Sequence, residues 1–316
     1  MTSNVILMAL VPVFFVLLLG FVAGKARIVD NGHVEGLNAL VMDFALPASL
    51  FAATASAPRD RITDQVPVFL VFGVTMLIIY IAWYWFERTF FAVTRSDAAV
   101  QALTVAFPNL AGVGLPILSA VLGPAGVVPV AVALATGSVL VSTLTLVIAE
   151  ISASKARGTD APASPVPTAI GRAFAKPVVW APALGIVLSL SDVNLDPLVH
   201  ACLVLIGNAA AGVALFLTGL VLSAQSLRID WRVVAATGAA DILRPLFAIA
   251  IAYGFHLGPD AAKTAILLAA LPSGFFGILF AVNYRLDSAT VGSMVIASTG
   301  FSVATLAIAI ATLFPH

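Results

Sequence analysis

Apolar residues form long continuous runs along the chain, and short polar breaks divide them into ten. The runs cover residues 5–24, 34–56, 66–90, 97–122, 126–150, 174–191, 198–224, 231–257, 261–283 and 288–314. A helix that spans a bilayer needs about 20 apolar residues. Strands of a membrane β-barrel would alternate apolar and polar residues, and lipid admits only helices or closed barrels. The pattern therefore predicts an all-α integral membrane protein with ten transmembrane helices.

Composition agrees with a membrane protein and excludes several classes of function. Of the 316 residues, 61% are hydrophobic and 9% are charged, and the mean hydropathy is +1.10. A soluble domain carries about 25% charged residues. The 15 basic and 15 acidic residues balance and form no basic run, so nucleic acid is not an expected partner. A single cysteine, Cys202, excludes a disulfide framework and a multi-thiolate metal site, and no cofactor is predicted.

The distribution of Lys and Arg predicts the orientation in the membrane. The N-terminal run is too long for a signal peptide and follows no basic segment, so it is expected to remain as the first helix. With the N-terminus outside, inside loops hold Lys25, Arg27, Arg88, Arg95, Lys155, Arg157, Arg172, Lys176, Arg228, Arg232 and Arg285. Outside loops hold only Arg59, Arg61 and Lys263. This bias predicts a multi-pass protein of the cell (inner) membrane with both termini outside and the central loop in the cytoplasm.

The two halves of the chain share residues at a nearly constant spacing. Pro12-Val13 and Leu19-Gly20 recur 165 residues later as Pro177-Val178 and Leu184-Gly185, and Ala106-x-Pro108 recurs after 164 residues as Ala270-x-Pro272. Because each half holds five helices, the second half must start at the opposite face of the bilayer, which makes the repeats inverted. The predicted division is a first repeat over 1–151, a cytoplasmic linker over 152–173 and a second repeat over 174–316.

Two of the ten runs carry helix-breaking residues near the middle of the bilayer. These residues are Pro108, Gly112, Gly114 and Pro116 in one run, and Pro272, Gly274 and Gly277 in the other. Unwound backbone at this depth survives only where it is buried in protein or lines a cavity. Secondary carriers with inverted repeats form their substrate site from such broken helices, and a half-helix N-terminus favours an anion such as a carboxylate.

These two segments also carry a family resemblance. Pro108-Asn109-x4-Gly114-x-Pro116-Ile117-Leu118 resembles the Pro-Asn-x4-Gly-x-Pro-Leu-Leu segment of auxin efflux carriers. Ala270-Leu271-Pro272-x-Gly274, followed by Phe280-Ala281-x-x-Tyr284, resembles the ninth helix of the same family. The short central loop is similar to that of the bacterial branch, whose members are often assigned as permeases for malonate or related carboxylates.

The resemblance implies ten helices, a crossover of helices 4 and 9 at their prolines, and an anionic substrate beside it. By the same resemblance, Asn109 is the residue that binds the substrate carboxylate. We expect Ser273 to add a side-chain hydrogen bond and the backbone at Gly112, Gly114 and Gly274 to supply the rest. Ser273 replaces a longer polar residue of the plant pattern, so the substrate need not resemble auxin. Homodimers occur in the family, but nothing in the sequence marks an interface.

Polar residues inside the runs are candidates for ion coupling, because burying them in a membrane costs free energy. They are Asp43, its repeat mate Asn208, and the pair Asp241 and Arg244. Asp43 is either a buried acid that serves helix packing or a carrier of a coupling proton or sodium ion. Asn208 is either a packing amide or a ligand. Asp241 and Arg244 stand three residues apart on one helical face, which predicts either a structural ion pair or a coupling pair.

Taken together, the sequence predicts a secondary active transporter that moves a small mono- or dicarboxylate, such as malonate, by alternating access. No enzyme motif is present, and the chain is not expected to be an enzyme. Three alternatives stay open: a sodium-coupled symporter of the related bile-acid type, a passive channel and an intramembrane enzyme. Sodium-stimulated uptake would favour the first alternative.

Overall fold

The structure is a computed structural model, and it describes residues 2–29, 34–156, 171, 174–191 and 193–315. Every regular element within these residues is helical, and the one β-bridge pairs Pro108 with Ser273 in antiparallel fashion. The prediction of an all-α protein is therefore confirmed for the described part of the chain. Seven helical stretches there are long and apolar enough to cross a membrane. The chain is a multi-pass membrane protein.

Nine α-helices lie in the first half of the described chain. Their bounds are α1 Thr2–Lys25, α2 Val34–Ala39, α3 Leu46–Ala55, α4 Arg59–Thr63, α5 Val66–Phe90, α6 Arg95–Ala106, α7 Leu115–Leu122, α8 Val127–Gly137 and α9 Thr143–Ala156. Short π-helical segments join several of them, over Leu40–Ala45, Leu110–Gly114 and Ser138–Ser142, and a 3-10 turn covers Gly123–Gly126. The start of the expected linker, residues 152–156, belongs to α9, whereas 157–170 and 172–173 lie outside the described residues.

The described second half contains eight α-helices. Their bounds are α11 Pro177–Leu190, α12 Pro197–Gly207, α13 Ala209–Ser223, α14 Trp231–Gly238, α15 Arg244–Gly254, α16 Pro259–Ala270, α17 Phe276–Asn283 and α18 Ser288–Leu313. A π-helical segment over Ala239–Leu243 joins α14 to α15.

The seven long stretches fall short of the ten predicted spans for three local reasons. The run 97–122 is broken between α6 and α7, and the run 261–283 is broken between α16 and α17. Helix α11 has 14 residues and is shorter than a full span. The residues from Leu110 to Ala149 form one helical stretch, because only a 3-10 turn separates α7 from α8.

Two extensive helix pairings form one side of the molecule. Helix α1 packs along α13, and helix α11 packs along α3. Backbones approach closely in both pairs: a Cβ on Gly20 would lie 2.0 Å from the Phe216 carbonyl oxygen, and a Cβ on Gly185 would lie 2.9 Å from the Phe51 carbonyl oxygen. Small residues at helix crossings allow such backbone contact within a membrane. Each glycine is therefore required by close packing.

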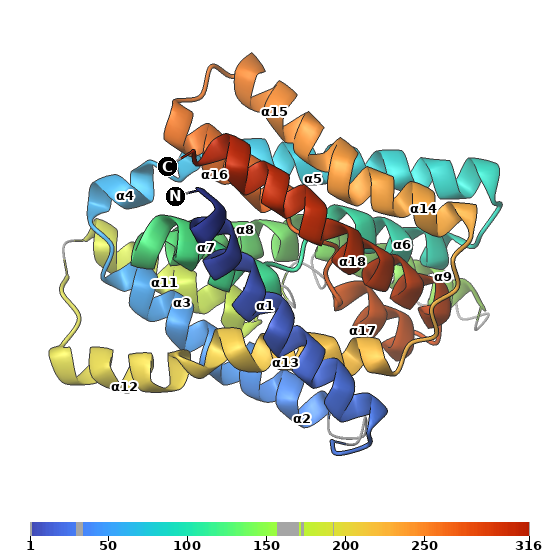
Figure 1. Ribbon diagram of the computed structural model, residues 1–316, viewed down its shortest axis with the longest axis horizontal. Coiled ribbons are helices and arrows are strands. Elements are labelled where there is room, and N and C mark those ends of the chain that lie inside the picture. Colours follow the sequence, from blue (N-terminus) through green and yellow to red (C-terminus); the bar gives the residue numbers. More distant parts are fainter. Residues whose placement is uncertain (1, 30–33, 157–170, 172–173, 192, 316) are drawn as a thin grey trace.

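The other side of the molecule gathers the broken helices. Helix α5 packs on α6, α15 packs on α16, and α18 contacts α14, α16 and α17. In Figure 1 both ends of the chain lie toward the same end of the long axis, where α1 begins and α18 ends. The π-helical segment Leu110–Gly114 contacts α13, so the helix breaks lie where the two sides of the molecule meet.

Candidate functional site

Both helix breaks occur at the proline-glycine segments that the sequence indicates. Helix α6 ends at Ala106, Phe107 is extended, and the chain becomes helical again at Leu110. Helix α16 ends at Ala270, Leu271 is extended, and α17 begins at Phe276. Pro116 stands in the first turn of α7, and Gly277 stands in the first turn of α17 against Thr104. Prolines that cannot donate a backbone hydrogen bond thus sit where each helix stops or restarts.

The two breaks meet and pair through their backbones. The Asn109 N–H donates to the Pro272 carbonyl at 2.8 Å, and the Gly274 N–H donates to the Phe107 carbonyl at 3.0 Å. A Cβ on Gly274 would lie 3.0 Å from both the Phe107 and Pro108 carbonyl oxygens, so glycine allows the close approach. We refer to residues 107–109 and 271–274 as the crossing.

Asn109 is held within the crossing from two directions. Its side chain is 2% exposed. The Oδ1 atom accepts the Gly112 N–H at 3.0 Å, which caps the helix that restarts at Leu110. The Nδ2 group reaches Thr218 Oγ1 of α13 at 3.4 Å, the long end of the hydrogen-bond range. The amide therefore keeps one weakly engaged donor at the boundary between the two sides of the molecule.

Ser273 connects the crossing to a buried carboxylate. Ser273 is 1% exposed, and its backbone N–H donates to Ser298 Oγ of α18 at 2.9 Å. The Ser298 hydroxyl in turn donates to Asp241 Oδ1 at 2.8 Å. Asp241 is 2% exposed, and its Oδ2 atom has no hydrogen-bond partner among the described residues. Asp241 thus contacts the crossing indirectly, through one serine hydroxyl.

Arg244 lies directly behind the crossing and is fully buried. Its Nη1 donates to the Val105 carbonyl at 2.6 Å, its Nε donates to the Ala269 carbonyl at 2.8 Å, and its Nη2 donates to the Leu271 carbonyl. Asp241 interacts with it electrostatically, but no ion pair joins these two described side chains. The expectation of a direct pair between Asp241 and Arg244 is therefore corrected, because backbone carbonyls take the guanidinium donors.

Asp43 and Asn208 lie away from these groups. Asp43 stands on the π-helical segment Leu40–Ala45, and its side chain is exposed at the surface of the protein. Lys176 is its electrostatic neighbour. The expectation that Asp43 is buried is thus corrected. Asn208 is exposed between α12 and α13 and lines a cavity of about 530 Å³ with Arg61 and His200. Ten residues of helix separate it from Thr218, or about 15 Å at 1.5 Å per residue.

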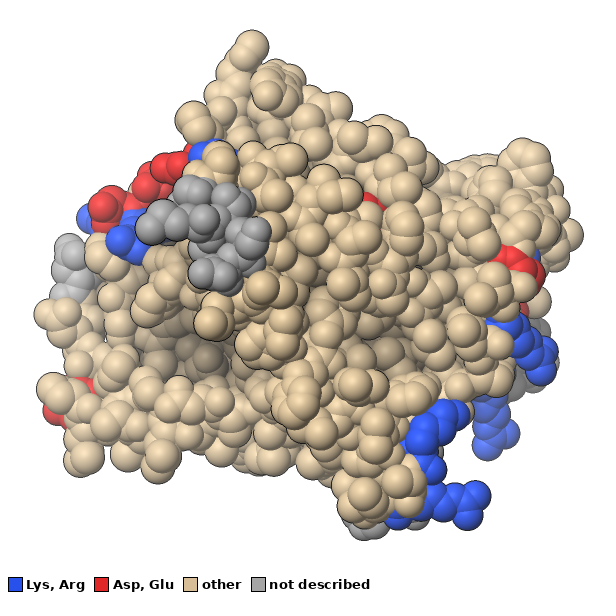
Figure 2. Space-filling model, in the orientation of Figure 1, with Lys and Arg blue, Asp and Glu red and all other residues tan. Residues whose placement is uncertain are grey.

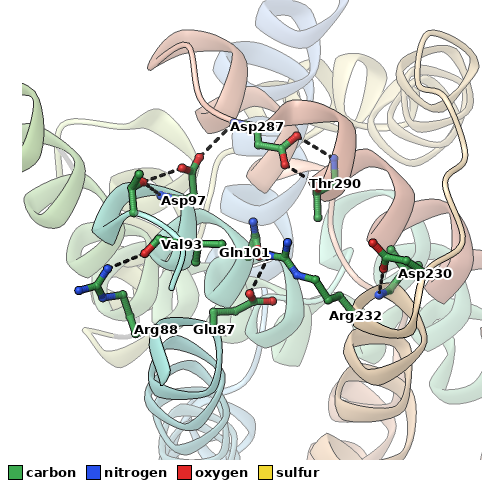
Figure 3. Close-up of polar contacts among 11 residues, drawn as sticks. Glu87, Arg88, Val93, Asp97, Gln101, Asp230, Arg232, Asp287 and Thr290 are labelled. Atoms are coloured by element: carbon green, nitrogen blue, oxygen red, sulfur yellow. Dashed lines mark hydrogen bonds and ion pairs between the residues drawn. The ribbon is translucent and has the colours of Figure 1, made fainter. Parts of the chain in front are cut away.

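A second arginine of the same helical unit, Arg232 of α14, binds side chains of α5 and α6. Arg232 Nη2 donates to Glu87 Oε2 at 2.8 Å and to Gln101 Oε1 at 3.0 Å, and its guanidinium lies 4.3 Å from the Phe91 ring centroid. Figure 3 shows Arg232 between the Glu87 and Gln101 side chains. Two arginines of the α14–α15 unit therefore bind α6, at Gln101 and at Val105.

Sequence reasoning missed the partners of the crossing. Thr218 and Ser298 are polar residues in apolar helices, with no motif around them. Their intramembrane polarity was the available signal, and it is weak because Ser and Thr often bond to the preceding helical turn, as Thr218 does to Ala214.

Comparison with known families identifies the class of this protein. A family model described as "Membrane transport protein" matches residues 5–310, nearly the whole chain. The chain belongs to this family. This is the auxin efflux carrier family, whose motifs the segments around Pro108 and Pro272 resemble. The family predicted from the sequence is therefore confirmed.

Several proteins named as transporters align with almost the full length of the chain. "Uncharacterized transporter YfdV" of Escherichia coli (strain K12) is 29% identical over 296 residues, 93% of each chain. "Putative malonate transporter" of Rhizobium meliloti is 25% identical over 303 residues, 93% of this chain and 92% of the relative. "Uncharacterized transporter" of Methanothermobacter thermautotrophicus is 26% identical over 301 residues, 93% of this chain and 94% of the relative.

Proposed function

We propose that this membrane transport protein is a secondary active transporter that moves a small organic anion across the cell membrane by alternating access. A mono- or dicarboxylate such as malonate is the expected substrate. The observation that carries the proposal is the buried crossing of two broken helices, with a side-chain amide facing the other side of the molecule. The name of the Rhizobium meliloti relative, a putative malonate transporter, supports the carboxylate class.

The substrate site is formed by the crossing. Asn109 Nδ2 exchanges its 3.4 Å contact with Thr218 for the substrate carboxylate, while Oδ1 keeps its cap on Gly112. The backbone at Gly114, Ser273 and Gly274 lines the same site. Two helices begin there, at Leu110 and Phe276, and the partial positive charge of a helix N-terminus stabilises an anion.

Burial of the crossing supports alternating access. Asn109 is 2% exposed and Ser273 is 1% exposed, so an anion reaches them only after the helices move apart. The contact between Asn109 and Thr218 lies on the boundary between the two sides of the molecule, which makes that boundary the expected sliding surface. The structure then corresponds to a closed state in the transport cycle.

Inverted repeats with ten helices are the architecture that we propose, and equivalent contacts support it. Gly20 meets the Phe216 carbonyl, and Gly185 meets the Phe51 carbonyl; both partners shift by 165 residues between these contacts. The same shift converts the hydrogen bond from Asn109 to Pro272 into the one from Gly274 to Phe107. A two-fold axis through the bridge of Pro108 and Ser273 would produce this exchange.

Charge distribution supports an orientation with both termini outside. In Figure 2, most charged side chains on the visible face gather toward its two ends, and the broad band between them shows only one small acidic patch. Lys and Arg dominate at the end far from the chain termini of Figure 1. Basic residues concentrate on the cytoplasmic side of membrane proteins, so that end is assigned to the cytoplasm.

A proton is the coupling ion that we assign if the carrier imports its substrate, because moving an anion into a cell that is negative inside costs free energy. Of the four coupling candidates, Asp241 is the carboxylate that connects to the crossing, through Ser298. Asp43 becomes the second candidate, because its side chain is exposed at the protein surface. Asn208 lines the cavity that also contains His200 and, among the described residues, is not connected to the crossing.

The experiment compares variants of Asn109 in a thermal-shift titration of the purified protein with malonate and related carboxylates, since a ligand raises stability by RT ln(1 + [L]/Kd). Asn109→Asp keeps the cap on Gly112 but presents a negative charge to the anion. It should lose about 1.5–3 kcal/mol of binding, the value of a hydrogen bond to a charged group, or roughly 10- to 150-fold in Kd.

Two further variants separate binding from folding. Asn109→Ala loses both the cap and the donor, so it should bind weakly and also melt at a lower temperature. Asn194→Ala, which removes an exposed amide, is the matched control and should behave as the wild type. Wild-type affinity in Asn109→Asp, or no response of the wild type to any carboxylate, would contradict the proposed site.

A further inference from the structure

The guanidinium of Arg244 binds backbone carbonyls at and beside the crossing. Val105 lies in the last turn of α6, Ala269 lies in the last turn of α16, and Leu271 follows α16 directly. All three carbonyl oxygens accept from Arg244, through Nη1, Nε and Nη2 respectively. One side chain therefore binds the C-terminal ends of both half-helices at once.

Carbonyls in this arrangement form a site for a cation. The last carbonyls of a helix lack intrahelical partners and carry the negative end of the helix dipole. Carriers built on broken helices use such carbonyls and half-helix C-termini to coordinate a coupling sodium ion or proton. Here two half-helix C-termini converge on one fully buried positive charge that is covalently part of the chain.

The surroundings of Arg244 differ from those of an ordinary buried ion pair. Arg232 of α14 binds the Glu87 carboxylate of α5 directly at 2.8 Å (Figure 3). Arg244 instead donates to three carbonyls. Its acidic neighbour Asp241 accepts a hydrogen bond from Ser298 through one carboxylate oxygen. Asp241 balances the charge without occupying the donors of the guanidinium.

We propose that Arg244 is the resident cation of this transporter and occupies the position where a coupling metal ion would otherwise bind. Sodium is then not required for substrate binding or for the stability of the crossing. This inference rests on the proposed function only where it gives Arg244 a role in transport. Its effect on the crossing is independent of which anion is carried.

The first test replaces the cation of the buffer in the wild-type protein. Melting temperature and malonate affinity are measured in sodium, potassium and choline chloride at equal ionic strength. We expect the three salts to agree within twofold in affinity and to give the same melting temperature. A tenfold or larger tightening by sodium, or stabilisation by sodium alone, would overturn the inference.

The second test empties the site and refills it. Arg244→Ala should melt at a lower temperature, and millimolar guanidinium chloride, far below denaturing concentrations, should restore part of the loss. Choline chloride at the same concentration should not. Arg285→Ala, which removes an exposed arginine just after α17, is the control, and guanidinium should not change its melting temperature. An Arg244→Ala protein that melts like the wild type, or that guanidinium fails to stabilise, contradicts the proposal.

A third pair of variants decides the matter if Arg244→Ala does not fold. Arg244→Lys keeps a positive charge with fewer donors, whereas Arg244→Gln keeps donors without the charge. A resident cation predicts that Arg244→Lys melts well above Arg244→Gln. Equal melting temperatures, or an Arg244→Gln variant that is more stable than Arg244→Lys, would show that the charge has no role there. These measurements need no substrate, so a failure of malonate to bind would count against the proposed substrate alone.

Discussion

Substituting Gly20 tests both the packing of α1 on α13 and its proposed equivalence to α11 on α3. In Gly20→Ala the new Cβ would lie 2.0 Å from the Phe216 carbonyl oxygen, whereas ordinary contacts begin near 3.4 Å. The two backbones must therefore separate by roughly 1.4 Å or distort, because a carbonyl in a helix cannot turn away as a flexible side chain can. In Gly185→Ala the Cβ would lie 2.1 Å from Thr54 Oγ1 and 2.9 Å from the Phe51 carbonyl.

The magnitude follows from two opposing terms. Overpacking of this kind costs about 1–3 kcal/mol. Replacing glycine by alanine inside a helix stabilises the folded protein by about 0.5–1 kcal/mol. Gly212→Ala in α13 isolates the second term, since a Cβ at this exposed residue would meet no atom within 4 Å. Gly20→Ala and Gly185→Ala should therefore each be less stable than Gly212→Ala by about 1–3 kcal/mol.

Melting curves of the purified variants, followed by tryptophan fluorescence in one detergent, give the order of stability. We expect Gly212→Ala to lie at or slightly above the wild type and both other variants to lie below it. If Gly20→Ala is destabilised and Gly185→Ala is not, the two pairings are not equivalent and the inverted repeat loses its best support. If neither variant differs from Gly212→Ala, the close helix approach itself is wrong.

Two further predictions concern topology and a buried ion pair. In a Cys202→Ala background, single cysteines at positions 2, 160 and 316 should label from outside, inside and outside respectively, and outside labelling at 160 would reverse the assigned orientation. Arg232→Met should cost about 3–5 kcal/mol, because it leaves the fully buried Glu87 carboxylate without a counter-ion. Arg232→Met combined with Glu87→Leu should recover most of that loss in a melting experiment, and a double variant as unstable as the single one would refute this reasoning.

The helix breaks could be predicted from sequence because their causes are local. Pro108 and Pro272 are each followed by glycines within a few residues, and this combination ends α6 and α16. A lone proline is not enough, since Pro12 and Pro182 stand inside α1 and α11. The repeat register was harder to assign. Sequence matching equates Pro108 with Pro272, but the backbone pairs Pro108 with Ser273, which gives the spacing of 165 found between Gly20 and Gly185. For the proposed repeat, backbone hydrogen bonding therefore favours a register of 165, which the proline match alone does not indicate.

The side-chain partners could not be predicted, for two physical reasons. Arg244 binds carbonyls from α6 and α16, and nothing in its own helix indicates which distant backbone groups lack partners. Asp43 and Asp241 stand on π-helical segments, where an added residue per turn rotates the following side chains away from the faces that a period of 3.6 predicts. The burial of Asp43 was mispredicted at a helix irregularity of this kind.

The electrostatic field at the crossing follows from which helix ends face it and which are already bound. Four half-helix ends converge there: the C-termini of α6 and α16, and the helical starts at Leu110 and Phe276. Arg244 binds the two negative ends, so their partial charges are compensated within the protein. Among the described residues, no acidic side chain is bonded to the positive ends; Asn109 caps one of them with a neutral oxygen. The uncompensated field is therefore positive, and it favours an anion beside Asn109, as the proposed carboxylate site requires.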